Sequence, residues 1–352
     1  MNNTKYISNY IIDYYNKHKR NLPWRNKKKL CQNPYYTLVS EVMLQQTKVD
    51  KVKVFYRKFL NKWPTIKKLS EADVSDVLAI WSGLGYYRRA INLHRTAQII
   101  DKKFNGIIPK NKESLKMLPG IGEYTASAII SFAYGKYSII IDTNIKRFII
   151  RILGLKEDIK EKDLVTQAKT IFPSENTSDF AQGIMDYASK ICLKIKPKCN
   201  LCEIKKYCNY TYSVDRRKSK IVKEKSRKYC YSYFLVTNKE KFLITKRPYN
   251  GMLAGLYEVP TSVWNIGDWP ENCYKNIKLC ISEKEKIFVD TLKHEFSHFI
   301  LFTRVSLVKV KEGNFKKNNY IWVDKERLKK LPISSLTNKI VNYSFSRISC
   351  LK

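Results

Sequence analysis

The sequence predicts a protein of two domains, an all-α N-terminal domain followed by an α+β C-terminal domain. Apolar residues recur at helical spacing through the first two hundred residues, where no segment alternates convincingly as a strand would. Residues 213–228 are highly charged and lack this periodicity, as is typical of a linker. After them, residues 229–237 and 241–246 alternate like two strands. We therefore expect an N-terminal domain at 1–210, a linker at 211–228 and a C-terminal domain at 229–352.

The individual elements follow from local patterns. In the N-terminal domain, apolar spacing predicts helices over residues 5–18, 35–47, 49–59, 75–81, 87–104, 113–118, 125–132 and 144–151, and a helical pattern from 163 to 192. In the C-terminal domain, we expect strands over residues 229–237, 241–246, 288–292, 298–310 and 320–323, with helical or irregular segments at 328–331 and 338–345.

Residues 118–144 contain a tight turn, Gly120-Ile121-Gly122, between two predicted helices. Pro119 stops the first helix, and the second helix begins after the turn. A short turn of this kind presents free backbone N–H groups at a helix N-terminus, where a phosphate can bind. The region therefore predicts a phosphate contact.

A second glycine turn, at residues 83–85, precedes two tyrosines and two arginines at residues 86–89. Aromatic rings and guanidinium groups after a flexible turn suit contact with unstacked bases and phosphates. A helix that ends at Gly83 and a new helix that begins at Tyr87 would explain the same residues. The two interpretations are compatible.

Glu41 is a charged residue within an apolar stretch, next to Val42, Met43 and Leu44. A glutamate in a helix is usually solvated, but these neighbours make burial plausible. Burial raises the pKa of a carboxyl, which allows it to act as a general acid.

Asp142 follows the apolar run 139–141 and precedes the helix predicted at 144–151. An aspartate at the start of a helix is an N-cap, a catalytic group, or both.

Four of the nine cysteines are clustered, namely Cys192, Cys199, Cys202 and Cys208. Zinc sites usually pair their cysteines as Cys-x2–4-Cys twice, whereas this cluster has only one short pair. A four-cysteine iron–sulfur cluster fits the spacing better. The lysines within the cluster, at positions 194, 196, 198, 205 and 206, would face a phosphate backbone.

The chain carries 67 basic and 31 acidic residues, for a formal net charge of +36. This excess favours a polyanionic partner, with nucleic acid as the first candidate. Lysine is abundant along the whole chain, so a compositional bias is the alternative source of the charge. No run of about 18 apolar residues and no signal peptide is present. Together with an odd number of cysteines, this favours a cytoplasmic protein with reduced thiols and no membrane partner.

Taken together, the motifs resemble those of MutY-type adenine DNA glycosylases along nearly the whole chain. They are LPWR at 22–25, SEVMLQQT at 40–47, GLGYYRRAINLH at 83–94, LPGIGEYTASAI at 118–129, IDTNIKR at 141–147, the four clustered cysteines, GLYEVP at 255–260 and FSH at 296–298. Each motif is modest evidence alone, whereas their joint occurrence in this order is highly specific. The resemblance implies a helix-hairpin-helix glycosylase domain with a 4Fe-4S cluster on Cys192, Cys199, Cys202 and Cys208. It also implies a monomer, associated with the nucleoid, that binds double-stranded DNA.

The resemblance further implies hydrolysis of the N-glycosidic bond of adenine mispaired with 8-oxoguanine or guanine. Glu41 resembles the general acid that protonates adenine at N7. Asp142 resembles the carboxylate that stabilises an oxocarbenium-like sugar, a division of labour that glycosidases share. Tyr124 and Asn144 resemble the residues that hold the sugar and this carboxylate in place.

Adenine must leave the duplex to be reached, so the resemblance also implies a set of DNA contacts. They are Trp24, Arg25, Leu44 and Asp186 for the adenine, Gln46, Leu84 and Tyr86 for the base stack beside the lesion, and Gly120 and Gly122 for a phosphate.

The C-terminal domain is similar to the Nudix fold of 8-oxo-dGTP hydrolases, because Gly255 to Pro260 matches the start of their signature. The acidic part of that signature is missing, since Glu271 is the only glutamate between Pro260 and Cys280. Magnesium-dependent pyrophosphate hydrolysis is therefore not expected. The resemblance instead implies recognition of 8-oxoguanine by Phe296, Ser297 and His298.

Two alternatives follow from the same residues. The first is an endonuclease III-like glycosylase and lyase that acts on oxidised pyrimidines. Thr143 after Asp142 resembles the pattern of that enzyme, whereas adenine DNA glycosylases usually have glycine at this position. That chemistry uses a lysine in the hairpin to form a Schiff base, and Tyr124 stands at this position. The second alternative is a basic DNA-binding iron–sulfur protein without catalytic activity.

Overall fold

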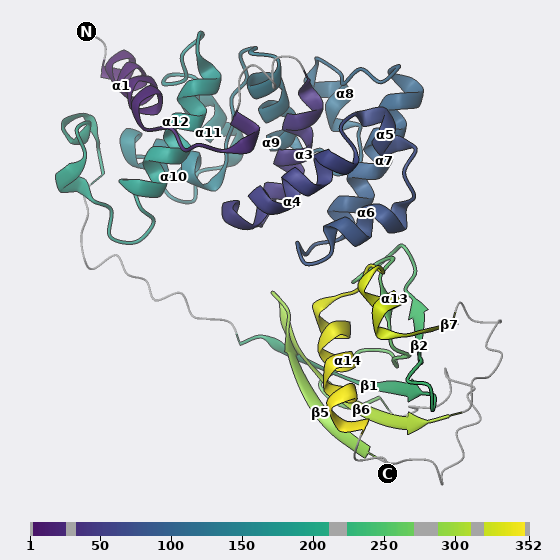
Figure 1. The fold of residues 1–352 in the computed structure, drawn as a ribbon. Helices are drawn as coiled ribbons and strands as arrows, with labels where there is room; N and C mark the ends of the chain where they lie inside the picture. Colours follow the sequence, from purple (N-terminus) through teal and green to yellow (C-terminus); the bar gives the residue numbers. More distant parts are fainter. Residues whose placement is uncertain (1–2, 26–32, 211–223, 271–287, 311–319, 349–352) are drawn as a thin grey trace. The chain divides into compact units, whose positions relative to one another are not determined.

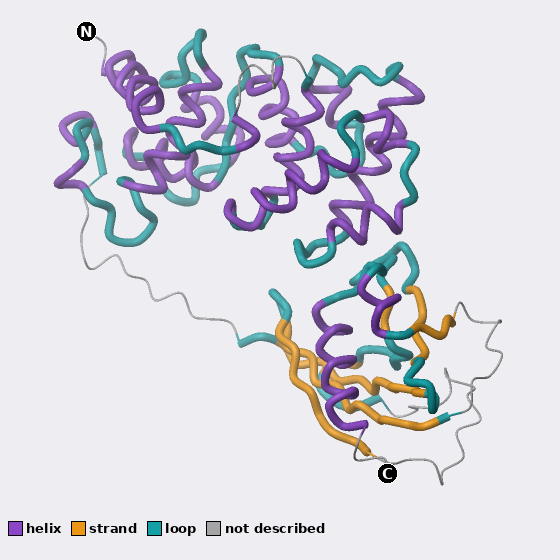
Figure 2. Tube along the Cα trace, viewed as in Figure 1, coloured by secondary structure: helices purple, strands orange, loops and turns teal. Residues whose placement is uncertain are grey.

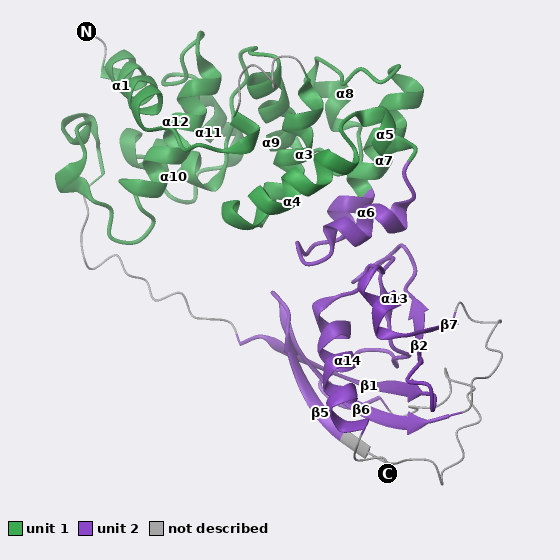
Figure 3. Ribbon diagram, viewed as in Figure 1, with its two compact units in different colours: residues 1–71, 92–218 green, residues 72–91, 219–352 purple. Residues whose placement is uncertain are grey.

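The computed structural model describes residues 3–25, 33–210, 224–270, 288–310 and 320–348 (Figure 1). The chain divides into two compact units, residues 1–71 with 92–218 and residues 72–91 with 219–352 (Figure 3). Within the described residues, strands occur only in the second unit (Figure 2). The predicted combination of an all-α part and an α+β part is therefore confirmed. The proposed linker falls largely on residues outside the described part, and the domain boundaries stay a prediction.

The first unit is built from helices. They are α1 (Asn3–His18), α3 (Pro34–Leu44), α4 (Val49–Lys62), α5 (Ile66–Ser70), α8 (Lys112–Lys116), α9 (Glu123–Ala128), α10 (Thr143–Leu153), α11 (Glu161–Ala168) and α12 (Thr177–Lys190), with the 3-10 turns η1 (Pro23–Arg25), η3 (Cys199–Leu201) and η4 (Lys205–Tyr207) and the π-helical turn η2 (Ile129–Ala133). Helix α7 (Arg88–Lys103) crosses the division between the units.

Helix α3 is shorter than the predicted helix 35–47, because it ends at Leu44. Gln45 leaves the helical region with ψ 111°, and Gln46 has a positive φ of 56°. The helix therefore ends three residues before the predicted end at Thr47.

Two other expected helices are divided in the structure. The predicted helix 125–132 consists of α9 and the π-helical turn η2 that follows it. The helical pattern predicted from 163 to 192 consists of α11 and α12, with a break at 169–176. Pro173 lies in this break, and a proline cannot continue a helix without losing a backbone hydrogen bond.

Helix α3 lies inside the first unit, since eight of its eleven residues are buried. Helices α1 and α12 pack closely against each other in a core that contains Ile11, Phe148, Phe180 and Ile184. The absence of a side chain at Gly183 allows this approach, because a Cβ there would lie 2.8 Å from the backbone oxygen of Ile11.

The second unit contains α6 (Val74–Trp81) and a seven-stranded sheet. Its strands are β1 (Ser226–Val236), β2 (Phe242–Lys246), β3 (Tyr257–Glu258), β4 (Asn265–Ile266), β5 (Phe288–Glu295), β6 (Phe299–Lys309) and β7 (Tyr320–Val323), followed by α13 (Lys325–Lys329) and α14 (Ser335–Arg347). The strand order is β3-β2-β1-β6-β5, with β4 on β1 and β7 on β2.

Strands β1 and β6 form the centre of this sheet and pair in parallel from Ser226 opposite Phe299 to Val236 opposite Lys309. The other strand pairs are antiparallel. Helix α14 covers one face, where Ile340 and Val341 share a core with β1 and β6. Within the described part of the chain, no helix is long and apolar enough to cross a membrane.

Candidate active site

A pocket of about 490 Å³ opens in the first unit, and it brings together segments that are far apart in the sequence. Its lining comes from the η1 region, α3 with the turn after it, the start of α9, the start of α10, and α12. The lining residues predicted from the sequence are Trp24, Arg25, Glu41, Leu44, Gln46, Tyr124, Asp142 and Asn144. The volume is in the range typical of small-molecule sites, large enough for one nucleobase.

Glu41 lies on the wall of this pocket with only 5% of its surface exposed. The Tyr124 hydroxyl donates a hydrogen bond to its carboxyl group. The second carboxyl oxygen, Oε2, is buried and has no hydrogen-bond partner in the described structure. A buried polar atom without a partner is costly, so this oxygen marks the place where a polar atom of a ligand would bind.

The pKa of Glu41 is raised to about 7, chiefly by burial; the hydrogen bond from Tyr124 opposes this rise, the nearby Asp142 carboxylate adds to it, and the charge of Arg25 opposes it. The carboxyl group therefore carries a proton over a pH range in which an exposed glutamate is ionised. This confirms the predicted burial, and it makes Glu41 a candidate for a general acid.

Asp142 is the N-cap of α10, since its Oδ1 accepts a hydrogen bond from the backbone N–H of Ile145 at 2.6 Å. Its Oδ2 accepts a hydrogen bond from Asn144 Nδ2 at 3.1 Å. Burial raises the pKa of Asp142, but these hydrogen bonds oppose the shift by stabilising the ionised form. Asp142 is therefore both an N-cap and a pocket carboxylate.

Arg147 fixes the orientation of Asn144, and the sequence did not single it out. Its Nη2 donates to Asn144 Oδ1 at 3.0 Å and to the carbonyl oxygen of Ala188 at 2.9 Å. Its Nε donates to the carbonyl oxygen of Cys192 at 3.0 Å. A basic residue one helical turn after Asn144 is the signal in the sequence that could have identified it.

Asp186 was expected beside the adenine, but it does not line the pocket. It is fully buried, and its two oxygens accept four hydrogen bonds from Arg20 and Arg25, at 2.6 to 3.1 Å. Burial acts to raise the pKa of Asp186, but the two arginines outweigh this effect and lower it. Asp186 therefore affects the pocket indirectly, because it orients Arg20 and Arg25, which line it.

Helix α12 contributes three further lining residues that the sequence did not single out, Gln182, Met185 and Ser189. Their spacing of three and four residues places them on one face of the helix. Trp24, another lining residue, packs edge-on against Tyr56 with 5.5 Å between ring centroids.

The predicted hairpin is formed by α8 and α9. Gly120 has a φ of +76°, and a Cβ at this position would lie 3.0 Å from the Cβ of Asn92. Gly122 is exposed, and a Cβ there would meet nothing within 4 Å. Phosphate binding by this turn stays a prediction.

The residues expected in the base stack differ in exposure. Gln46 and Tyr86 are exposed and both have positive φ values, 56° and 50°. Such backbone strain in residues other than glycine is frequent at functional sites. Leu84, by contrast, is buried with 4% exposure. Its side chain would have to leave the core to enter DNA.

The predicted recognition triplet is the turn between β5 and β6. Phe296 N–H donates to the carbonyl oxygen of Phe299 at 2.9 Å, and the two rings stack at 4.7 Å. Lys225 Nζ donates to the carbonyl oxygen of Phe296 at 3.0 Å. Ser297 and His298 are exposed at the tip.

The four clustered cysteines are all half-buried free thiols. Burial raises the pKa of Cys202 and Cys208, and the other thiols of the cluster add to the shift, so the four sulfurs lie within electrostatic range of one another. Among the described residues, no group of three or more Cys, His, Asp or Glu side chains has the arrangement of ligands to a metal ion. The predicted iron–sulfur cluster therefore stays a prediction.

Comparison with known proteins supplies the family. The model of the HhH-GPD superfamily of base excision DNA repair proteins matches residues 39–174, and a NUDIX domain model matches residues 232–343. An adenine DNA glycosylase of Buchnera aphidicola subsp. Baizongia pistaciae is 35% identical over 351 residues, which cover 97% of this chain and 92% of the relative. The chain belongs to the adenine DNA glycosylase family.

A second family member supports this assignment. The adenine DNA glycosylase of Buchnera aphidicola subsp. Acyrthosiphon pisum is 37% identical over 91% of this chain and 92% of its own length. Among solved structures, a thermostable thymine-DNA glycosylase is 31% identical, with a TM-score of 0.55, over 59% of this chain and 96% of its own. The helical glycosylase fold therefore serves more than one DNA glycosylase, while the match over nearly the whole chain is to the adenine DNA glycosylases.

Proposed function

We propose that this protein hydrolyses the N-glycosidic bond of adenine mispaired with 8-oxoguanine or guanine in double-stranded DNA. The observation that carries the proposal is the Glu41 carboxyl group, buried in a pocket of nucleobase size with one oxygen unpartnered and a pKa of about 7. Membership of the adenine DNA glycosylase family supports adenine as the base that is removed.

The adenine leaves the duplex and enters the pocket, because an enzyme cannot reach the glycosidic bond of a stacked base. Trp24, Leu44 and Met185 supply apolar contact, and Arg25 supplies hydrogen-bond donors. Asp186 supports this step by holding the guanidinium group of Arg25 with two hydrogen bonds.

Glu41 then donates its proton to N7 of the adenine, which makes the base a better leaving group. Asp142 stabilises the positive charge that develops on the sugar as the bond breaks. The two carboxyl groups differ because Glu41 is buried and accepts a hydrogen bond from Tyr124 with its Oε2 left unpartnered, whereas both oxygens of Asp142 accept hydrogen bonds, from Ile145 N–H and Asn144. Tyr124 joins them, since it donates to Glu41 and lies within electrostatic range of Asp142.

A lyase route through a Schiff base is not supported by the pocket lining. A Schiff base requires an amine, and no lysine lines this pocket among the described residues. Tyr124 occupies the hairpin position where such a lysine would stand. A monofunctional glycosylase is therefore favoured over an endonuclease III-like enzyme.

The rest of the molecule contributes DNA contacts in this proposal. The glycine turn 120–122, the exposed residues Gln46 and Tyr86, and Leu84 contact the DNA around the flipped base, and the turn 296–298 reads 8-oxoguanine. The net charge of +36 favours binding to DNA. The protein acts as a cytoplasmic monomer, associated with the nucleoid.

The four cysteines fit a 4Fe-4S cluster as a donor set, because Tyr187 and Arg151 direct hydrogen-bond donors at the sulfurs of Cys202 and Cys192. Thiolate ligands accept such bonds. The cluster would cross-link the segment 192–208, whose five lysines are exposed and would face the phosphate backbone.

Incubation with duplexes that contain A:8-oxoguanine, A:G or thymine glycol tests the proposal. We expect release of adenine from the first two duplexes, with strand breaks appearing only after alkali treatment. A borohydride-trapped adduct as abundant as that of a true lyase would exclude the monofunctional mechanism. Binding without release of any base would leave the non-catalytic DNA-binding protein.

A further inference from the structure

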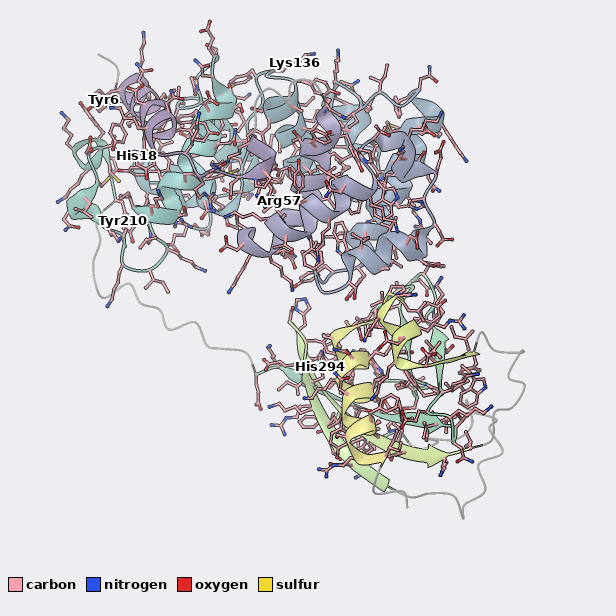
Figure 4. All side chains as sticks on the ribbon, in the orientation of Figure 1. Tyr6, His18, Arg57, Lys136, Tyr210 and His294 are labelled. Atoms are coloured by element: carbon pink, nitrogen blue, oxygen red, sulfur yellow. The ribbon has the colours of Figure 1, made fainter. Side chains whose placement is uncertain are left out.

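Tyr187 is a buried tyrosine of α12, with 1% exposure, between α1 and the cysteine segment. Its ring packs edge-on against Tyr10 at 6.0 Å, Tyr14 at 4.9 Å and Phe148 at 6.3 Å between centroids. Tyr6, labelled in Figure 4, extends this aromatic group along α1 toward Tyr207. A buried tyrosine needs a partner for its hydroxyl group, and the identity of that partner decides what the residue does.

The hydroxyl of Tyr187 donates a hydrogen bond to Sγ of Cys202 at 3.1 Å. A hydroxyl group has a single proton, and in this contact the proton of Tyr187 lies on the side of the sulfur. The hydroxyl of Tyr187 is therefore directed at one cysteine sulfur.

Arg151 is a second hydrogen-bond donor near the cysteines, but most of its hydrogen bonds go to backbone carbonyl oxygens. Arg151 Nη1 lies 3.3 Å from Sγ of Cys192, but it also donates to the carbonyl oxygen of Leu193 at the shorter distance of 2.6 Å. Its Nη2 donates to the carbonyl oxygen of Lys194 at 3.1 Å. Arg151 therefore holds mainly the backbone of the segment, whereas the hydroxyl of Tyr187 is aimed at a sulfur.

We propose that Tyr187 is a positioning residue that raises the reduction potential of the cluster through its hydrogen bond to Cys202. This inference rests on the proposed 4Fe-4S cluster. Reduction adds an electron to the cluster and increases the negative charge on its cysteine sulfurs. A hydrogen bond to such a sulfur stabilises the reduced form more than the oxidised form, which raises the potential.

The test compares the midpoint potential of the full-length wild-type protein with that of Tyr187→Phe, which removes the hydroxyl and keeps the ring. Tyr14→Phe is the matched control, because Tyr14 packs on the same ring while its hydroxyl lies in the field of Asp186. Iron content and visible absorption are measured first. We expect equal cluster content in the three proteins, a more negative potential in Tyr187→Phe, and the wild-type potential in Tyr14→Phe.

Equal potentials in wild type and Tyr187→Phe, at equal cluster content, would overturn the inference and leave the proposed glycosylase untouched. Purified wild-type protein without iron would instead remove the proposed cofactor, and with it this inference. If Tyr187→Phe is isolated without its cluster, the cluster is reconstituted with iron and sulfide before the potential is measured. A variant that cannot be reconstituted overturns the inference, because the hydroxyl would then be needed to hold the cluster and not to set its potential.

Discussion

At the scale of single residues, the pocket distinguishes two carboxyl groups by their surroundings. Glu41 is carried by a helix that is buried on most sides, and its neighbours supply one hydrogen bond. Asp142 lies at a helix N-terminus, where backbone and side-chain N–H groups stabilise the anion. One carboxyl group is therefore suited to donate a proton and the other to remain negative, which is the division that glycosidic chemistry requires.

Glu41→Gln tests the acid. We expect the variant to bind mismatched DNA with wild-type affinity and to lose adenine excision, because an amide cannot donate the proton. In wild type, the single-turnover rate should decline as pH rises through about 7, by roughly tenfold per unit above it, since the protonated form of Glu41 is lost. Excision that continues in the variant, or a rate independent of pH between 6 and 9, would assign the proton to another group.

The same carboxyl group predicts a pH-dependent stability. Its pKa is raised on folding from 4.5 to about 7, so wild type loses stability as pH rises through this window and the full penalty applies above it. Glu41→Gln has no such penalty. In urea unfolding, the free energy of unfolding of the variant should rise relative to that of wild type from pH 5 upward, by roughly 3 kcal/mol at pH 8. A difference that does not change with pH would mean that Glu41 is ionised in the folded protein.

Asp142→Asn separates the two roles of Asp142. Asparagine caps a helix about as well as aspartate, so α10 should remain capped and stability should change by less than about 1 kcal/mol. Excision should be lost, because the amide carries no negative charge for the sugar cation. Asp142→Ala is the comparison variant, since it removes the cap as well. Circular dichroism with thermal unfolding, beside a glycosylase assay, gives both readouts.

At the scale of secondary-structure elements, α12 joins the parts of the first unit. One face, with Gln182, Met185 and Ser189, lines the pocket. Asp186 orients the two arginines of the pocket wall, and Tyr187 reaches the cysteines. The helix therefore connects the pocket with the cysteine segment, and its own position depends on close packing against α1.

Gly183→Ala tests this packing. The added methyl group would lie 2.8 Å from the carbonyl oxygen of Ile11 and 2.9 Å from its Cγ2, so the two helices would have to separate. We expect a loss of about 1–3 kcal/mol in unfolding free energy. Gly122→Ala is the control, because its methyl group would enter open space at a negative φ. Equal stabilities of the two variants would show that α1 accommodates the methyl group without cost.

At the scale of the whole molecule, the two units carry different tasks in the proposed function. The pocket and its acid belong to the first unit, and the turn 296–298 belongs to the second. Chemistry on adenine and recognition of the opposite base should therefore respond to different substitutions.

Ser297→Ala tests this division. We expect a slower reaction on A:8-oxoguanine with little change on A:G, because in the proposed function the substitution removes a polar contact to the damaged base and leaves the pocket intact. Thr291→Ala is the matched control, since Thr291 is also exposed on β5 but lies outside the turn. Rates on both duplexes under single-turnover conditions give the preference directly, and an unchanged ratio would place recognition elsewhere.

The sequence by itself determined the features that depend on local spacing. These are the helices, the capping aspartate Asp142, the glycine turn at 120–122, the cysteine spacing and the family. Only the tertiary structure decided what depends on distant partners. It placed Asp186 behind Arg20 and Arg25, linked Arg147 to Asn144, and aimed Tyr187 at Cys202. Burial and hydrogen bonding in a folded core are set by residues remote in the sequence, which local patterns do not encode.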